Sequence, residues 1–233
     1  MNNAVMLVRD RPVLTRQALT TFFNHSKYEW SLVVVDDGSK AQNAAAVDML
    51  VGGRENVRVL RHPKPTCNTA LNRNLGIYWS EHYFGRGDWL YLSDNDACFT
   101  PSWDLFLCTA LKESGYGILG PYRHPYHQPN SQEVVEIGGK LLKIVETDAV
   151  QGLGWLLSWK TWDMFGHLNE HTGQGFGTNQ SEDWEYCQKI VKAGLKVGSL
   201  EPSVVYNCGL TDSQGKPCIG HELIERKEGV LYG

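Results

Sequence analysis

The chain has 233 residues, of which 42% are hydrophobic and 21% charged, and its formal net charge is -4. This composition is ordinary for a globular protein and excludes a disordered or fibrous chain, while the length suits one α/β domain or two small ones. The acidic balance disfavours a generic basic nucleic-acid binder and leaves room for a local basic groove.

The N-terminal stretch MNNAVMLVRDRP has no basic region followed by a long apolar core, so we do not expect a signal peptide. No apolar run approaches the roughly 18 residues that a membrane-spanning helix needs. The six cysteines form no CxxC pair, so we expect free thiols and no zinc site. These features predict a soluble, cytoplasmic protein.

The first half of the chain alternates between strand and helix patterns. Apolar runs predict buried strands at residues 4–8, 30–35, 57–60 and 89–92, and helical spacing predicts helices at 12–23, 44–50 and 69–80. Continuous apolar strands separated by helices are typical of a mostly parallel sheet flanked by helices. We therefore predict an α/β fold with a Rossmann-like central sheet.

The second half is more mixed. We expect a helix at 100–112, a strand at 117–120, a loop at 121–133, a hairpin at 134–144, a strand at 153–159, a short helix at 161–165, a glycine-bearing loop at 171–181, a helix at 182–193, strands at 196–200 and 203–207, and a polar tail to residue 233. No linker or repeat divides the chain. We predict one domain, with residues 1–99 binding one substrate and residues 100–233 binding the other.

Asp94-Asn95-Asp96 follows the predicted strand at 89–92. Two carboxylates one residue apart at the end of a buried strand are costly without a counter-charge. Mg2+ and Mn2+ prefer oxygen ligands and supply that charge. Asp and Asn are also common in turns, so this stretch alone leaves a metal site and a plain turn equally open.

A second acidic pair, Asp36-Asp37, ends the strand at 30–35. The carboxyl ends of parallel strands share one edge of a sheet, where ligands usually bind. A carboxylate there can accept hydrogen bonds from a ribose hydroxyl or a base N–H. With Arg9 and Arg73 near the same edge, the pattern suits a nucleotide diphosphate. Since the sequence has no glycine-rich phosphate loop, a metal would have to neutralise the phosphates.

A third acidic site, Glu182-Asp183, opens the helix predicted at 182–193. Acidic residues in the first turn of a helix usually offset the helix dipole. If this site stood alone, that role would be the better explanation of the pair. Beside a metal–diphosphate site, such a carboxylate can instead act as a general base for an incoming hydroxyl.

Five segments together resemble the inverting, family-two-type group of the GT-A glycosyltransferases. They are LVVVDDGS at 32–39, NTALNRNLG at 68–76, Asp94-Asn95-Asp96 as a DxD motif, GLGWLLSWKTWDMFGHLNE at 152–170, and Glu182-Asp183 as an ED pair. Each motif is weak by itself, whereas five in this order over residues 4–207 are much more specific.

The resemblance implies a GT-A fold and transfer of a sugar from a nucleotide donor, expected to be UDP-linked, to an acceptor hydroxyl. Asp37 would hold the base or ribose, and Arg73 would stand in the arginine place of the motif. Asp96, with Asp94 directly or through water, would hold Mn2+ or Mg2+ on the diphosphate. Asp183 would be the catalytic base, and a single displacement would invert the anomeric carbon.

The chain departs from the family at the third metal ligand. The family often has a His after the last strand, and Asn207 falls about where that His would be. His221, fourteen residues further along, is the other candidate because its tail could fold back.

The acceptor is left open. Trp155, Glu182 and Trp184 lie in segments that would border the acceptor cleft, and aromatic faces stack on sugar rings and flipped bases alike. For Trp159 and Trp162, core packing is at least as good an interpretation. The acceptor would be a saccharide or, as in viral DNA-modifying transferases, a hydroxymethylated DNA base, which would point to a virus-encoded enzyme.

For DNA, basic residues at 58–64 and 123–127 would contact phosphates. Two other classes compete. A sugar-phosphate nucleotidyltransferase would need a glycine-rich loop after the first strand, and residues 9–12 contain no glycine. A non-catalytic nucleotide- or sugar-binding module would not need Asp183.

Overall fold

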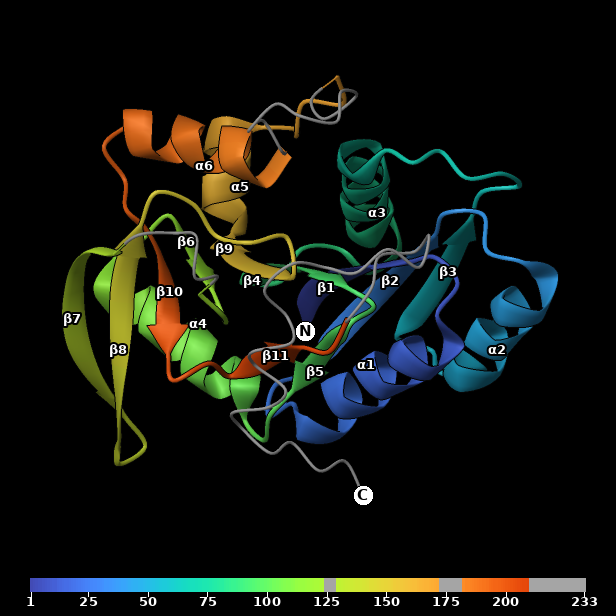
Figure 1. The fold of residues 1–233 in the computed structure, drawn as a ribbon, viewed down its shortest axis with the longest axis horizontal. Coiled ribbons are helices and arrows are strands. Elements are labelled where there is room, and N and C mark those ends of the chain that lie inside the picture. The colour runs from blue at the N-terminus through green and yellow to red at the C-terminus, as the bar shows by residue number, and fades with distance from the viewer. Residues whose placement is uncertain (124–128, 172–181, 210–233) are drawn as a thin grey trace.

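The computed structural model describes residues 1–123, 129–171 and 182–209. Within them, nine strands form one sheet in the order β3-β2-β1-β4-β9-β6-β10-β8-β7, and β5 and β11 form a separate two-stranded sheet. Helices cover both faces of the large sheet (Figure 1). The architecture is the α/β type that the sequence predicts.

The first half of the chain builds the parallel part of the sheet. Its elements are β1 (Asn2–Val8), α1 (Pro12–His25), β2 (Trp30–Asp36), α2 (Ala41–Val51), β3 (Val57–Arg61), α3 (Thr69–Phe84) and β4 (Trp89–Asp94). Strand β1 pairs in parallel with both β2 and β4, and β2 pairs in parallel with β3. The predicted alternation of strands and helices is therefore confirmed.

The second half is mixed, as predicted. Its elements are β5 (Ala97–Phe99), α4 (Trp103–Ser114), β6 (Ile118–Gly120), β7 (Pro129–Ile137), β8 (Lys140–Thr147), β9 (Gly154–Ser158), α5 (Trp159–Phe165), α6 (Glu182–Lys192), β10 (Val197–Glu201) and β11 (Val205–Asn207). Strand β9 runs antiparallel between β4 and β6, while β10 is parallel to β6 and antiparallel to β8.

Two sequence predictions are wrong in detail. Strand β5 is missing from the prediction, because its partner β11 lies far away in the sequence and a three-residue strand has little periodicity of its own. Strand β7 starts at Pro129, inside the loop expected at 121–133, because it pairs with β8 over a longer hairpin than the apolar pattern indicates.

The core forms two layers, one on each face of the sheet. Helices α1, α2 and α4 pack on one face, and α3, α5 and α6 pack on the other (Figure 1). Gly76 lets α3 come close to the sheet, since a Cβ there would collide with Val5 and stand 3.0 Å from Cγ2 of Val35. This close approach sets the depth at which the first turns of α3 meet the ends of the strands.

Among the described residues, no helix combines the length and the apolar character needed to cross a membrane. Among the cysteines that the structure describes, Cys98, Cys108 and Cys187 are buried and Cys67 is exposed.

Candidate active site

The site lies at the carboxyl ends of the parallel strands. Because β1, β2 and β4 run in the same direction, Asp36 at the end of β2 and Asp94 at the end of β4 reach the same edge of the sheet. This is the juxtaposition that the sequence predicts. The second half of the chain adds the segment before β9 and the first turn of α6 to this edge.

The two residues of the Asp36-Asp37 pair have different partners. Asp36 is fully buried and accepts hydrogen bonds from Nε of Arg61 at 2.8 Å and from the amide of Ser39 at 2.9 Å. It therefore closes the turn after β2. Asp37 accepts bonds from the amide and hydroxyl of Thr66, both at 2.7 Å, and from the amide of Cys67 at 3.0 Å.

Burial tends to raise the pKa of Asp37, and the hydrogen bonds from Thr66 and Cys67 outweigh burial and hold the pKa below its usual value. The carboxylate is thus ionised and fixed. The turn depends on Gly38, whose φ of +71° is a conformation that favours glycine. A side chain would also not fit there, since a Cβ added to Gly38 would lie 2.5 Å from the carbonyl carbon of Lys64. The predicted nucleotide-binding carboxylate holds the 64–67 loop in place.

Arg9, the other predicted donor-site residue of this region, lies beside the same loop. Its Nη1 donates to Sγ of Cys67 at 3.1 Å. Asp37 and Arg9 therefore contact the same loop.

In the Asp94-Asn95-Asp96 turn, the middle residue is the anchor. Asn95 is buried, and its Nδ2 donates to Oγ1 of Thr15 at 2.8 Å and to the carbonyl of Asp10 at 3.3 Å. These bonds tie the turn to the start of α1. Asp94 and Asp96 on either side are consequently held in fixed positions.

Asp96 has a partner that the sequence did not indicate. Nη1 of Arg11 donates to its Oδ2 at 3.0 Å. On the other side, Gly209 packs so closely that a Cβ would collide with Oδ2 and stand 3.0 Å from Cγ of Asp96. Asn207 lies opposite Ala97 in the β5–β11 pair, next to Asp96, and its Oδ1 accepts the amide of Gly209 at 2.8 Å. His221, the other candidate third ligand, lies outside the described residues.

Arg73 joins the two halves of the site. Its guanidinium, in a side chain only 1% exposed, donates to Oδ1 of Asp94 at 3.1 Å and to Oε1 of Glu182 at 3.0 Å. It also donates to the carbonyl of Gly152 at 2.7 Å and rests over the ring of Trp155 at 4.8 Å. A single buried cation therefore neutralises carboxylates from both β4 and α6.

The carboxyl groups around Arg73 are crowded. Burial, and then the nearby charges of Asp96 and Glu182, raise the pKa of Asp94 to about 7, against the opposing charge of Arg73. Solvent still reaches Asp94, since 34% of its side-chain surface is exposed. Burial and the charge of Asp183 likewise raise the pKa of Glu182, again against Arg73.

Asp183, the predicted catalytic base, lies in the first turn of α6. Its Oδ2 accepts the amide of Gly152 at 2.9 Å, and its Oδ1 accepts the amide of Trp184 at 2.8 Å. Gly152 thus touches both ends of the network, with its carbonyl on Arg73 and its amide on Asp183. The carboxylate is oriented by backbone groups.

Of the three residues expected at the acceptor cleft, Trp155 lies in the core, Glu182 pairs with Arg73, and Trp184 is partly buried. Trp155 is fully buried, packed under Arg73 and stacked on Tyr186 with ring centroids 5.7 Å apart. That expectation is corrected, because the alternation of β9 turns Trp155 into the layer of α3 and α6. Glu182 is the counter-charge of Arg73 and has 16% of its side chain exposed. Trp184 is partly buried against the same core.

The segment at 152–170 is held by α3. Asn74 is buried and exchanges bonds with the backbone of Leu168, donating to its carbonyl at 2.9 Å and accepting from its amide at 3.0 Å. Asn74 also donates to Glu170, and Asn68 donates to the carbonyl of Glu170. The α3 motif therefore positions both the DxD turn, through Arg73, and the turn at 168–170.

The donor set of the turn suits a hard divalent cation. Oδ2 of Asp94 and Oδ1 of Asp96 make no hydrogen bond within the described part of the chain, and carboxylate oxygens are the ligands that Mg2+ and Mn2+ prefer. Residues 1–123, 129–171 and 182–209 contain no group of three or more His, Cys, Asp or Glu side chains arranged as ligands. Water, the donor phosphates or a residue outside these ranges would complete the shell.

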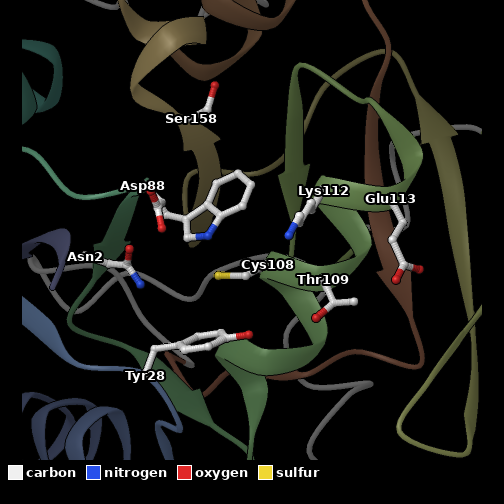
Figure 2. Close-up of a pocket in the computed structure, with 9 residues that line it drawn as sticks. Asn2, Tyr28, Asp88, Cys108, Thr109, Lys112, Glu113 and Ser158 are labelled. Atoms are coloured by element: carbon white, nitrogen blue, oxygen red, sulfur yellow. The ribbon is translucent and has the colours of Figure 1, made fainter.

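A separate cavity of about 610 Å³ lies at the opposite edge of the sheet (Figure 2). It opens where β1 and β4 begin and β9 ends, beside α4. Its lining residues are Asn2, Tyr28, Asp88, Trp89, Cys108, Thr109, Lys112, Glu113 and Ser158. None of them belongs to the carboxylate network, so we place the chemistry at the carboxyl edge.

Solved structures share this fold at low identity. The mannosyltransferase PcManGT from Pyrobaculum calidifontis, solved in complex with GDP-Man and Mn2+, matches with a TM-score of 0.60 and 13% identity over 84% of this chain and 55% of its own. S. aureus TarS matches with a TM-score of 0.63 and 13% identity over 92% of this chain and 38% of its own. The chain thus spans little more than half of one relative and less than half of the other.

The fold is therefore the GT-A fold of nucleotide-sugar glycosyltransferases, as the sequence predicts. The family model described as "Glycosyl transferase family 2" matches residues 4–152, which is more than half of the chain. The chain belongs to glycosyl transferase family 2. No curated protein matches it.

Proposed function

We propose that the protein transfers a sugar from a nucleotide donor to the hydroxyl of a saccharide acceptor, with inversion and with Mn2+ or Mg2+ at the DxD turn. The observation that carries this proposal is the Arg73 network. One guanidinium pairs with both Asp94, at the end of β4, and Glu182, at the start of α6, so these two parts of the chain lie side by side. A donor held at Asp94 and Asp96 would thereby lie next to Asp183. Residues 1–99 would supply the donor half of the site and residues 100–233 the acceptor half.

On the donor side, Asp37 and Arg9 would hold the nucleoside through the loop at 64–67. Asp96 and Asp94 would hold the cation, which would offset the charge that develops on the leaving diphosphate. We favour a UDP-linked donor. PcManGT was solved with GDP-Man, so the base must be tested together with the sugar.

On the acceptor side, Asp183 would accept the proton of the attacking hydroxyl. The acceptor oxygen would bond to the anomeric carbon as the bond from that carbon to the diphosphate oxygen breaks, which inverts the configuration. The bonds from Gly152 and Trp184 would keep the Asp183 carboxylate oriented during this step. Arg73 would keep Glu182 from competing as a base, since the two are paired at 3.0 Å.

A saccharide acceptor is favoured over DNA because two of the basic residues expected to meet phosphates are paired with carboxylates of the protein. Arg61 pairs with Asp36 and Asp48, and Arg123 pairs with Glu201 at 2.6 Å. His124 and His127 lie outside the described residues. Retardation of duplex DNA carrying hydroxymethylated pyrimidines at low salt, with loss at higher salt, would instead favour the DNA acceptor.

The experiment that tests the proposed base is Asp183→Asn. We expect donor turnover to fall by a factor of 100 or more, because general-base catalysis typically contributes about 10²–10⁴-fold. Binding of nucleotide diphosphate with Mn2+ should change little. Turnover at the wild-type rate would refute the role of Asp183, and loss of both turnover and folding, read from circular dichroism, would assign it a structural role instead.

A paired test addresses the metal. Asp96→Ala should weaken binding of UDP in the presence of Mn2+ and leave binding of UDP in its absence nearly unchanged, because Asp96 would act through the cation. Identical titrations for wild type and variant with Mn2+ present would remove Asp96 from the metal site.

A further inference from the structure

Arg11 lies inside the proposed donor site, paired with the carboxylate that is proposed to hold the metal. The Nη1–Oδ2 distance to Asp96 is 3.0 Å, and the two side chains are only 15% and 14% exposed. A charge-assisted hydrogen bond between side chains that are this well buried is stronger than an ion pair at the surface. Asp96 is therefore already neutralised by the protein itself.

The backbone around Arg11 is fixed to the same turn. Arg11 has a φ of +54° and precedes the first residue of α1. The amide of Thr15 donates to its carbonyl at 2.9 Å, and Asn95 binds the hydroxyl of Thr15 and the carbonyl of Asp10. The backbone distance between Arg11 and Asp96 is thus set by tertiary structure, which leaves rotation of the Arg11 side chain as the simplest way to separate the two charges.

The guanidinium of Arg11 is incompletely satisfied. Nη2 is buried and meets no acceptor within the described part of the chain. A buried N–H donor without a partner is costly. An anion with several oxygens placed next to Asp96 would supply the missing acceptor, and the guanidinium fork matches phosphate geometry.

We propose that the guanidinium of Arg11 exchanges one partner for another, pairing with Asp96 before the donor binds and with the donor diphosphate afterwards. In the site without donor, Arg11 occupies Asp96 as a stand-in cation. When the divalent ion and the diphosphate bind, Asp96 turns to the ion, and the guanidinium of Arg11 turns to the diphosphate, where Nη2 also finds an acceptor. The inference rests on the proposed metal-dependent use of a nucleotide sugar and assigns a role to a residue outside the matched motifs.

The exchange predicts opposite effects on two binding steps. Removing the Arg11 charge frees Asp96, so Mn2+ alone should bind more tightly. The same change removes a phosphate contact, so UDP together with Mn2+ should bind more weakly. One charge-assisted hydrogen bond corresponds to about tenfold in each affinity.

The test uses Arg11→Gln, which keeps most of the side-chain stem, and Arg16→Gln as the matched control. Arg16 is exposed on α1, the helix that Arg11 precedes, so its loss changes the net charge equally outside the site. Mn2+ binding to the intact protein is followed by electron paramagnetic resonance, which needs no turnover. Binding of UDP is followed by calorimetry at saturating Mn2+.

We expect Arg11→Gln to bind Mn2+ about tenfold more tightly and UDP with Mn2+ about tenfold more weakly, while Arg16→Gln matches the wild type. Unchanged or weaker Mn2+ binding in Arg11→Gln, with normal binding in the wild type, overturns the exchange and leaves the proposed function intact. Tighter Mn2+ binding without weaker UDP binding also overturns it. No Mn2+ binding in any of the three proteins refutes the metal site and the exchange together.

Discussion

Two arginines in this protein make nearly the same contacts at different depths. Arg73 pairs with Asp94 and Glu182 and lies 4.8 Å from the centre of the Trp155 ring, with 1% of its side chain exposed. Arg86 pairs with two carboxylates, those of Glu81 and Asp163, and lies 4.6 Å from the Trp159 ring, with 37% of its side chain exposed. They form a matched pair for measuring what burial adds.

Replacing Arg73 by alanine would leave two crowded carboxylates without their shared cation. Breaking a buried ion pair by removing one partner typically costs about 3–5 kcal/mol, because the remaining charge stays desolvated. For Arg86 the carboxylates can turn to water, and exposed pairs contribute about 0–1 kcal/mol. Since Asp94 keeps 34% of its side chain exposed, we expect the cost for Arg73→Ala near the lower end, about 3 kcal/mol.

The assay is urea unfolding at pH 7 without metal, comparing the wild type with Arg73→Ala and Arg86→Ala. We expect the free energy of unfolding to fall by about 3 kcal/mol for the first variant and by less than about 1 kcal/mol for the second. Adding Glu182→Gln to Arg73→Ala should recover part of the loss, because it removes one uncompensated charge. Equal losses for the two single variants would refute the claim that Arg73 is the electrostatic link between the halves of the site.

Three further substitutions test the contacts of Asp37, Gly76 and Asn74, each by urea unfolding. Asp37→Asn should lower stability by about 1–2 kcal/mol at pH 7, because charged acceptors bind the Thr66 loop more strongly. Since the pKa of Asp37 is lowered in the folded protein, its stabilisation is present above about pH 4 and is lost as the pH falls further, so the difference from wild type should shrink there; a constant difference would contradict this. Gly76→Ala should destabilise by about 1–3 kcal/mol through its collision with Val5, despite alanine's better helix propensity, and a more stable variant would show that α3 can move away. Asn74→Ala should cost about 1–3 kcal/mol by leaving backbone groups of the 168–170 turn unpaired, and a change below 0.5 kcal/mol would contradict that role.

The sequence predicts most of the fold because the first half repeats a simple unit. Apolar strands and amphipathic helices alternate, and a parallel sheet follows from that alternation. The same reasoning places Asp36 and Asp94 at one edge, because parallel strands end together. The sequence predicts a strand where β11 lies, but β5 and its pairing with β11 were beyond prediction, since a three-residue strand has little pattern of its own and its partner is far away in the sequence.

Side-chain partnerships were harder to predict than positions. Arg73 was expected to face the donor, and in the structure its guanidinium is buried among Asp94, Glu182 and Gly152. Trp155 was expected to face the acceptor and lies in the core. Both outcomes depend on which layer a side chain enters, which is set by contacts with α6, a helix far away in the sequence. The Arg11–Asp96 pair escaped prediction because its two residues lie 85 positions apart in the sequence and meet only in the folded chain.

The central claim is that this edge of the sheet activates a nucleotide sugar with the help of a divalent cation. The most direct measurement is the release of free nucleotide diphosphate from a panel of UDP-, GDP- and dTDP-linked sugars, with Mn2+ or with a chelator and without added acceptor. We predict slow hydrolysis of one donor class in Mn2+, abolished by the chelator and by Asp96→Ala. Absence of release from every donor, or release at the same rate with the chelator present, would contradict the claim.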